Sequence, residues 1–399
     1  MVRVLIGGVV ALAIAMGVAR FAFTPILPAM QAATGLGTDG AGLLASVNYL
    51  GYFLGALAAG LVPHGRVRTA VFRVSLLLSV CSTAAMGLDL GNAERAMPVW
   101  LVLRFVSGLS SAGIFILGIA MVLDTLTRRG GERLAGWLYT GVGSGIAASG
   151  LFVGLAGGWL GWAGDWLALG AICAGLGLMP WLWLSDPLQP AHPAAGTAAG
   201  KPPGLSMPLL LLTAAYFLQG GGYIVSATFM VSILKTDPGT AAVGEMAWMM
   251  AGLGAMGGGV TWAAVARRTS GWWSLILLHL VQAAVVLLPM SGSPVLALVA
   301  AILFGSTFVG AVSQSFALGR QLSAGGSARV VGALTAIYGL GQIIGPLPAG
   351  MVVARTGSFN LALVGAAAAV LAAAVLLVLG MLIAGRQSSG DPAMISTKA

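Results

Sequence analysis

The strongest constraint on this chain is the recurrence of long apolar stretches from one end to the other. Only 7% of its 399 residues are charged and 58% are hydrophobic, whereas a soluble domain is about 25% charged. So few charges cannot cover a surface that faces water. A lipid bilayer is the solvent that suits this composition, because the stretches have the length of about 20 residues that a membrane-spanning helix needs. The sequence predicts an all-α integral membrane protein.

Twelve such stretches are present, and a segment rich in proline, alanine and glycine divides them into two groups of six. This segment, 185–205, is typical of a flexible linker and is expected in the cytoplasm. We therefore expect two six-helix halves, 1–184 and 206–385, and a cytoplasmic tail at 386–399. The predicted spans are 4–30, 41–62, 69–90, 97–125, 134–158, 162–184, 206–234, 243–266, 271–290, 294–319, 328–353 and 358–384.

The distribution of basic residues predicts the orientation of the chain. With the amino terminus in the cytoplasm, 14 of the 19 Lys and Arg residues lie on the cytoplasmic side and 3 on the opposite side. The remaining two, Arg20 and Arg104, lie inside spans. By the positive-inside rule, both termini are expected in the cytoplasm and the chain in a bacterial-type inner membrane. Orientation accounts for the net charge of +9, so we expect no nucleic-acid partner.

Short motifs of the first half recur at corresponding places in the second. GLVPHGRVR (60–68) follows the second span, and WAAVARRTSG (262–271) follows the eighth. VLRFVSGLSSAG (102–113) in the fourth span parallels ILFGSTFVGAVS (302–313) in the tenth. Two six-span repeats around a site near the membrane midplane are a design used by transporters.

Four stretches carry a resemblance to a known family: GVARFAFTPILPAM (17–30), NYLGYFLGALAAG (48–60), YFLQGGGYIVSATF (216–229) and YGLGQIIGPLPAG (338–350). On these stretches the chain resembles the major facilitator superfamily and, more narrowly, its YbfB/YjiJ branch across nearly the whole length. The resemblance implies twelve transmembrane helices in two pseudo-symmetric six-helix halves. It also implies secondary active transport by alternating access, without naming the cargo.

The superfamily's motifs are only partly present. Arg104, Gly108 and Ala112 match the fourth-span motif, whose arginine is associated with coupling or with holding spans together. The superfamily's loop between spans 2 and 3 usually carries Gly, then an Asp, then basic residues, but GLVPHGRVR has no Asp. The fifth-span motif of antiporters appears as Gly141 and Gly145 without its proline.

Arg20 lies inside the first span, about eight residues and roughly 12 Å before Pro28, which marks the outer end. A charge at membrane depth costs several kcal/mol unless it finds a partner. We expect Arg20 to face a central cavity, with Thr24 one turn further on the same face, and to bind an anionic group of the cargo. The alternative is a structural arginine that ties the first span to carbonyls or glutamine side chains nearby.

Uncharged polar residues at helical spacing are the other candidates to line the cavity. In lipid such groups should face protein or water, and the alternative for each is a hydrogen bond that joins two helices. The glycine triplet 220–222 can break or bend the seventh span, and broken spans mark transporter sites. The candidates are Asn48 and Tyr52 in span 2, Tyr216, Gln219 and Tyr223 in span 7, Gln314 in span 10, and Tyr338 and Gln342 in span 11.

None of the ten acidic residues lies at the middle of a predicted span. Two buried cations without a midspan anion favour an anionic cargo, so we expect a small organic anion such as a carboxylate. The proton gradient or exchange would drive transport, and Arg104, Asp124 and Glu245 are the coupling or structural candidates, with His279 a further titratable group. The alternative cargo is a drug or apolar metabolite that the same fold exports.

Other classes of function find little support in the sequence. It has no phosphate-binding loop of the GxxxxGK[ST] type, no Cys/His spacing typical of a metal site and only three histidines. We therefore predict no enzyme, catalytic residue, metal or cofactor. The expected partners are a small-molecule substrate, protons and the lipid bilayer, and we expect a monomer. A non-transporting sensor and an integral membrane enzyme remain as alternatives of a different class.

Overall fold

A computed structural model of the chain describes residues 1–186, 206–323 and 327–389. These residues form helices joined by short turns. Eleven helical segments among them are long and apolar enough to span a membrane. The segment Ala135–Trp183 contains Gly161 at φ 63° and ψ 173°, and this glycine divides it into two spans. The prediction of twelve spans is thereby confirmed, while 187–205 and 390–399 of the predicted linker and tail lie outside the described residues.

The first six spans are built from seven α-helices and one π-helix. Their bounds are α1 (Val2–Leu12), η1 (Ala13–Arg20), α2 (Phe23–Thr34), α3 (Thr38–Ala59), α4 (Arg66–Ala85), α5 (Ala93–Arg128), α6 (Ala135–Leu138) and α7 (Thr140–Trp183). The next six spans are built from seven α-helices, of which α12 and α13 form one span. Their bounds are α8 (Met207–Thr236), α9 (Gly244–Arg268), α10 (Gly271–Leu287), α11 (Pro294–Gln321), α12 (Ser327–Ile344), α13 (Pro346–Thr356) and α14 (Asn360–Ser389).

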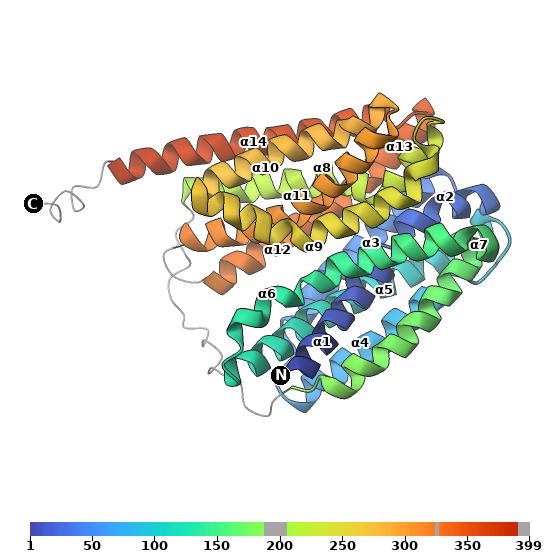
Figure 1. The fold of residues 1–399 in the computed structure, drawn as a ribbon, viewed down its shortest axis with the longest axis horizontal. Helices are drawn as coiled ribbons and strands as arrows, with labels where there is room; N and C mark the ends of the chain where they lie inside the picture. The colour runs from blue at the N-terminus through green and yellow to red at the C-terminus, as the bar shows by residue number, and fades with distance from the viewer. Residues whose placement is uncertain (187–205, 324–326, 390–399) are drawn as a thin grey trace, which may run out of the picture.

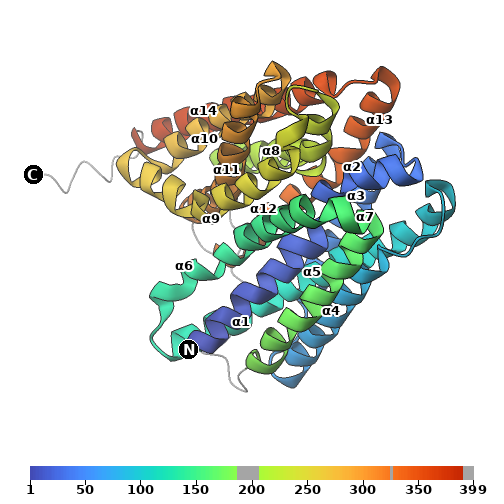
Figure 2. The same cartoon turned by 45° about the vertical axis from the view of Figure 1, so that its right-hand side comes forward.

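Helices α1–α7 form one bundle and helices α8–α14 form a second, shown from blue to green and from yellow to red (Figures 1 and 2). The two bundles meet along α7 with α9 and along α3 with α13. Helix α7 begins with span 5 and α9 is span 8, whereas α13 belongs to span 11 and α3 is span 2. In the repeat, span 5 corresponds to span 11 and span 2 to span 8, so the two contacts are equivalent. In both views the bundles lie close together near α2 and α13 and are further apart near the amino terminus and α6.

Glycine contacts inside the bundles show the same symmetry. A methyl group at Gly108 in span 4 would collide with the carbonyl of Asn48 in span 2. At the corresponding place, a methyl group at Gly305 in span 10 would collide with the carbonyl of Ala251 in span 8. Small residues permit such close packing of backbones, which drives helix association where no hydrophobic effect acts. Two pseudo-symmetric halves are therefore present, as predicted.

The first span is interrupted at its middle. It continues from α1 into the wide turns of η1, which end at Arg20, and α2 begins at Phe23. Pro25 is the physical cause, because it has no backbone N–H to donate to the carbonyl of Phe21 and its ring crowds that carbonyl. Span 11 is interrupted in a similar way between Ile344 and Pro346.

The seventh span, α8, runs without interruption through the glycine triplet, which the sequence indicated as a place where the helix can break or bend. Its glycines serve close packing instead. A methyl group at Gly220 would lie 2.8 Å from the carbonyl oxygen of Tyr338, and one at Gly222 would lie 2.7 Å from that of Ala366. The triplet therefore lets α12 and α14 approach α8, and the broken spans are the first and the eleventh.

Candidate functional site

Arg20 lies where the two halves meet. Its side chain is buried, and Nη2 donates a 2.8 Å hydrogen bond to Oε1 of Gln342 in span 11. Two rings of span 2 cover the guanidinium, with its Cζ 4.1 Å from the ring centre of Tyr52 and 4.7 Å from that of Tyr49. Cation–π contacts of this kind stabilise a buried cation without neutralising it. None of the ion pairs in the described part of the chain includes Arg20.

The edge of the Arg20 guanidinium keeps unused donors. Within the described residues its buried Nε has no hydrogen-bond partner, and Nη1 has only a 3.9 Å contact to the sulfur of Met16. A guanidinium presents its N–H groups in a planar fork that suits the two oxygens of a carboxylate. Rings cover the faces of this fork, so an anion would bind at its edge.

The second half supplies a polar and aromatic partner to this arginine. Gln342 donates from Nε2 to the hydroxyl of Tyr223 in span 7, which completes a chain from Arg20 to Tyr223. The ring of Tyr223 stacks on Phe308 at 5.1 Å and on Tyr338 at 5.6 Å, and Tyr338 stacks on Tyr216 at 4.3 Å. The planes differ by at most 15°. Of the residues predicted in spans 7 and 11, four therefore form one assembly.

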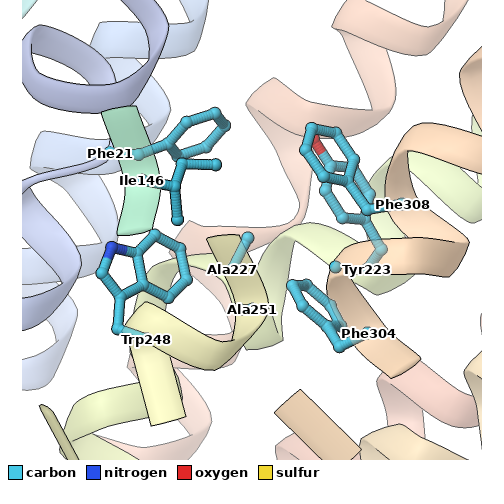
Figure 3. Close-up of a pocket in the computed structure, with 9 residues that line it drawn as sticks. Phe21, Ile146, Tyr223, Ala227, Trp248, Ala251, Phe304 and Phe308 are labelled. Atoms are coloured by element: carbon cyan, nitrogen blue, oxygen red, sulfur yellow. The ribbon is translucent and has the colours of Figure 1, made fainter. Parts of the chain in front are cut away.

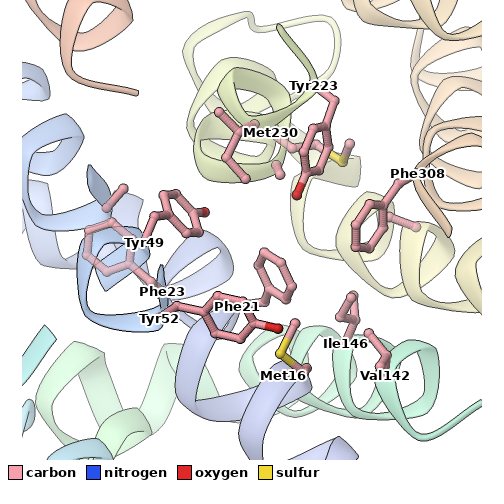
Figure 4. Close-up of a cluster of buried hydrophobic side chains, with 14 of the residues drawn as sticks. Met16, Phe21, Phe23, Tyr49, Tyr52, Val142, Ile146, Tyr223, Met230 and Phe308 are labelled. Carbon is pink, nitrogen blue, oxygen red and sulfur yellow. The ribbon is translucent and has the colours of Figure 1, made fainter. Parts of the chain in front are cut away.

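A small apolar pocket lies beside this assembly, between the halves (Figure 3). The side chains of Phe21 and Ile146 come from the first half, and across the pocket stand rings of the second half. Figure 4 shows the same junction with Tyr49 and Tyr52 on the side opposite Tyr223 and Phe308. The rings that line the pocket belong to Phe21, Tyr223, Trp248, Phe304 and Phe308.

Further hydrogen bonds join the halves on the side of Arg20 away from the amino terminus. Thr24 donates to the carbonyl of Ala227 at 2.6 Å, so this predicted residue also lies at the junction. Further along, Ser232 donates to Gln31 at 3.3 Å. Hydrogen bonds therefore join the two halves from Arg20 to Gln31, at the end of the molecule away from the amino terminus.

Two other predicted cavity residues, Asn48 and Gln219, make hydrogen bonds within one half. Asn48 donates at 2.8 Å to the carbonyl of Arg104 and so joins spans 2 and 4. Gln219 donates at 3.0 Å to Gln282 in span 9, inside the second half. Gln314 is buried on α11. Asn48 and Gln219 have the geometry of hydrogen bonds between helices, the alternative that we kept open for each.

Arg104 completes the broken first span. It donates to the carbonyls of Ala19 at 3.2 Å and Arg20 at 3.3 Å, and Ser107 donates to Ala19 at 2.8 Å. Interrupted backbone at membrane depth needs such partners, because lipid offers none. The geometry of Arg104 is thus that of a residue that positions Arg20. Two features of the sequence could have indicated this role for Arg104: the polar residues of span 4, and Pro25, which marks an interruption of span 1.

Asp124 belongs to a charge cluster that the sequence did not reveal. Arg68 contacts Asp124 at 3.1 Å and Asp186 at 3.2 Å. Asp186 also accepts from the backbone N–H of Gly65, at the start of α4, and its own N–H donates to Thr69 at 2.8 Å. The carboxylate that the loop between spans 2 and 3 lacks is therefore supplied by Asp186, just after span 6.

The remaining titratable groups lie away from Arg20. Glu245 pairs with Lys235, and both side chains are partly exposed. His279 is buried in α10, where Nδ1 donates to the carbonyl of Leu275 at 2.7 Å. Asp165 is fully buried, and neither of its oxygens has a hydrogen-bond partner among the described residues. It is one of the ten acidic residues that the sequence places away from the middle of a predicted span. Within the described chain no three acidic, His or Cys side chains are placed to hold a metal ion.

Solved structures of similar fold are transporters. A mutant form of the nucleoside transporter NupG gives a TM-score of 0.73 at 13% identity, covering 95% of this chain and 99% of that one. A bacterial homolog of the human lysosomal transporter Spinster, inward-facing and unoccupied, gives 0.66 at 17% identity, with 94% of each chain covered. The D-xylose–proton symporter gives 0.72 at 11% identity, covering 94% and 96%. At such identities these matches show the fold.

A search of curated proteins found no match. A family model, described as "Uncharacterised MFS-type transporter YbfB", matches residues 12–379. The match covers more than nine-tenths of the chain, from α1 to α14. The junction around Arg20 lies within this range. The chain therefore belongs to the YbfB family of multi-pass membrane transporters, within the major facilitator superfamily.

Proposed function

We propose that this chain transports a small organic anion by alternating access, and that Arg20 binds the anionic group. One observation carries the proposal: a buried guanidinium lies between the two halves, has no carboxylate partner in the described residues and keeps an unpartnered N–H at its edge. A buried cation without a counter-ion is costly, so an arriving anion gains affinity there.

The contacts of Arg20 also suit a site that must open. Its one strong hydrogen bond to the other half goes to Gln342, a neutral side chain. The guanidinium is charged but its acceptor is neutral, so the halves can separate around Arg20 without leaving an unpaired carboxylate. Cargo would then replace Gln342 as the partner of the guanidinium.

The membrane setting proposed from the sequence completes this function. We propose two halves, 1–184 and 206–385, with the linker 185–205 and the tail 386–399 in the cytoplasm. The protein would be a monomer of the inner membrane. It would not be an enzyme and would bind no nucleic acid.

Cysteine labelling tests the orientation. In a background without Cys81 and Cys173, an impermeant thiol reagent added to intact cells should label Asp89→Cys and spare His64→Cys. The opposite labelling would reverse the orientation.

Coupling to protons or exchange is the proposed driving force. A proton-coupled symporter for D-xylose shares the fold, which supports protons as one candidate. Asp124 and Glu245 are ion-paired, whereas Asp165 is buried without a partner among the described residues, so Asp165 is the acid to test first. In proteoliposomes, Asp165→Asn should abolish proton-driven uptake and leave exchange intact. Unchanged proton-driven uptake would exclude this role.

Thermal stabilisation of the purified protein tests the proposal directly. A ligand at 100 times its dissociation constant adds about 2.7 kcal/mol to the stability of the folded state. A small carboxylate should raise the melting temperature of the unmutated protein but not of Arg20→Gln. The control is Arg95→Gln, which changes an exposed arginine outside the junction. Stabilisation that is equal in Arg20→Gln and in the unmutated protein would show that Arg20 is structural.

The aromatic pocket beside Arg20 favours one alternative, export of an apolar drug or metabolite. Its lining has no charged side chain, and its volume of about 10 Å³ would have to grow as the halves separate before an uncharged compound could bind there without contact to Arg20. In that case neutral compounds should stabilise the protein with or without the Arg20→Gln change. The same panel of ligands therefore separates the two cargo classes.

A further inference from the structure

We propose that the outer surface of spans 3 and 6 binds an anionic phospholipid, whose phosphate contacts Arg73 and whose acyl chains lie along the two helices. This surface is separate from the junction around Arg20, so the proposal does not depend on the cargo. Three features carry it: a guanidinium without an acidic partner in the described residues, an aromatic ring packed against it, and exposed apolar side chains one turn deeper.

One face of α4, which is span 3, carries two arginines followed by apolar residues. Arg66 begins the helix and is exposed, and Arg73 lies two turns further along and is partly exposed. Positions seven residues apart differ by only about 20° around a helix, so the two arginines share a face. Val74 and Leu77 follow, with 54% and 52% of their surface exposed. Arg73 therefore lies where the charged start of α4 changes to a surface suited to hydrocarbon.

The second part of α7, which is span 6, lies beside α4 and runs in the opposite direction (Figure 2). The Cζ atom of Arg73 lies 5.3 Å from the ring centre of Trp181, which is partly exposed. Because the helices are antiparallel, Leu178, one turn before Trp181, lies at about the depth of Leu77, one turn after Arg73. Leu178 is 61% exposed. A cation and an aromatic ring thus precede exposed leucines, in the order of the headgroup and acyl chains of a phospholipid.

Arg73 has no counter-ion among the described residues. The carboxylates near the start of α4 belong to Asp124 and Asp186, and both contact Arg68. Nε of Arg73 is buried without a hydrogen-bond partner in the described chain. A guanidinium presents its N–H groups in a planar fork that suits two oxygens of a phosphate. Arg73 therefore has donors and charge available for an anion that reaches the outer surface of the protein.

A phospholipid suits this place better than a soluble anion. Arg73 lies about 10 Å along the helix from Arg66, beside exposed apolar side chains. A soluble phosphate would lose water there and leave those side chains uncovered, whereas a phospholipid covers them with its own acyl chains. A headgroup with a net negative charge is attracted to both arginines, and a zwitterionic headgroup carries a positive charge that weakens this attraction.

The second half has a different arrangement at the corresponding place, between spans 9 and 12. Span 9, residues 271–290, contains no Lys or Arg. There the ring of Trp272 in α10 packs on α14, so that a methyl group added at Gly380 would lie 2.8 Å from it. A tryptophan therefore fills the place between the two helices without a cation beside it. We expect one strongly bound anionic lipid for each protein molecule.

Native mass spectrometry of the purified protein in detergent tests the site. The protein is stripped of lipid and titrated with phosphatidylglycerol or with phosphatidylcholine of the same acyl chains. One phosphatidylglycerol should bind more tightly than phosphatidylcholine. Arg73→Gln should raise the dissociation constant for phosphatidylglycerol roughly fivefold, the effect expected for one arginine near a membrane surface. Arg268→Gln, which removes an exposed arginine at the end of α9, is the control and should leave it unchanged.

A matched pair of tryptophan variants places the headgroup. Trp181→Leu removes the ring that packs against Arg73 and should also weaken the binding of phosphatidylglycerol. Trp183→Leu removes a ring two residues further along α7, where Cβ faces span 1 and lies 3.6 Å from a methyl group added at Gly7. This variant should bind the lipid as the unmutated protein does. Equal binding by Trp181→Leu and Trp183→Leu would overturn the placement of the headgroup beside Trp181.

Three further outcomes would contradict the proposal. Equal affinity of the unmutated protein and Arg73→Gln for phosphatidylglycerol would show that Arg73 does not bind the phosphate. Equal affinity of the unmutated protein for the two lipids would overturn the preference for an anionic headgroup. Inorganic phosphate that raises the melting temperature of the stripped protein as much as phosphatidylglycerol does would show that the occupant is a soluble anion. All of these results leave the proposed function of Arg20 untouched, because the two sites share no residue.

Discussion

The two buried arginines, Arg20 and Arg104, are stabilised by different kinds of contact. Arg104 donates to two backbone carbonyls of the interrupted first span, and its guanidinium lies 4.7 Å from the ring centre of Phe23. Arg20 has rings on its faces, one glutamine at its edge and an unpartnered Nε. The first arrangement stabilises a fixed backbone, and the second leaves an N–H group unpartnered within the described residues. The same residue type at similar depth therefore suits structure in one case and binding in the other.

We expect Arg104→Gln to destabilise the protein. The carbonyls of Ala19 and Arg20 would lose charge-assisted hydrogen bonds, at a cost of about 2–4 kcal/mol, because lipid cannot replace the donors. The melting temperature in detergent should fall well below that of the exposed Arg95→Gln control. A stable Arg104→Gln protein that binds cargo normally would contradict a positioning role for Arg104.

We also expect Asp186→Asn to destabilise the end of the molecule that holds Asp124. The buried Arg68 would keep only the more exposed Asp124 as a counter-ion, and the N–H of Gly65 would lose a charged acceptor. The loss should be about 1–3 kcal/mol in chemical denaturation. Glu94→Gln, an exposed acid in the first turn of α5, is the control and should change stability little. Equal stability of the two variants would show that the cluster contributes nothing.

At the scale of helices, the π-helix η1 packs unusually close to α7. A methyl group added at Gly17 would lie 2.8 Å from the backbone nitrogen of Ile146 and closer still to Gly145. Ser149 of the same helix donates to the carbonyl of Gly17 at 3.3 Å. The span 5 glycines that we identified in the sequence thus receive the first span, and their counterparts Gly341 and Gly345 receive α8.

Gly17→Ala should therefore destabilise the protein by about 1–3 kcal/mol, because neither backbone can move without disturbing Arg20. Gly257→Ala on α9 is the matched control, since an added methyl group meets nothing within 4 Å there. Alanine favours a helix over glycine by about 0.5–1 kcal/mol, so the control should be neutral or slightly stabilised. Melting temperatures of the two variants measure the difference. Equal effects would mean that close packing of η1 on α7 is not required.

At the scale of the whole molecule, alternating access requires the halves to separate where they now touch. The pair Gln31 and Ser232 forms a hydrogen bond across the junction, away from the amino terminus. With Cys81 and Cys173 removed, a short thiol crosslinker between Gln31→Cys and Ser232→Cys should block transport, and reduction should restore it. Each single cysteine variant is the control. Full transport by the crosslinked protein would show that this contact does not open.

The limits of prediction from the sequence are clearest at span 7. Tyr216, Gln219 and Tyr223 were assigned to one face from their spacing. Tyr216 and Tyr223 lie about 20° apart around the helix, whereas Gln219 lies about 60° from Tyr216. Most of α8 is buried on all sides, so that difference turns Gln219 toward Gln282 and away from the junction. Spacing alone does not say which neighbour a surrounded helix presents to each side chain.

The twelve spans, the two halves and the need of Arg20 for a partner follow from the sequence by itself. Apolar length determines a span, and a charge in lipid must be compensated whatever the fold. Only the tertiary structure decided that Arg104 completes the broken first span, that Asp186 supplies the missing acid and that Gln342 meets Arg20. Each of these contacts joins residues far apart in the chain, and their partners are set by how helices pack, which local patterns of hydrophobicity do not encode.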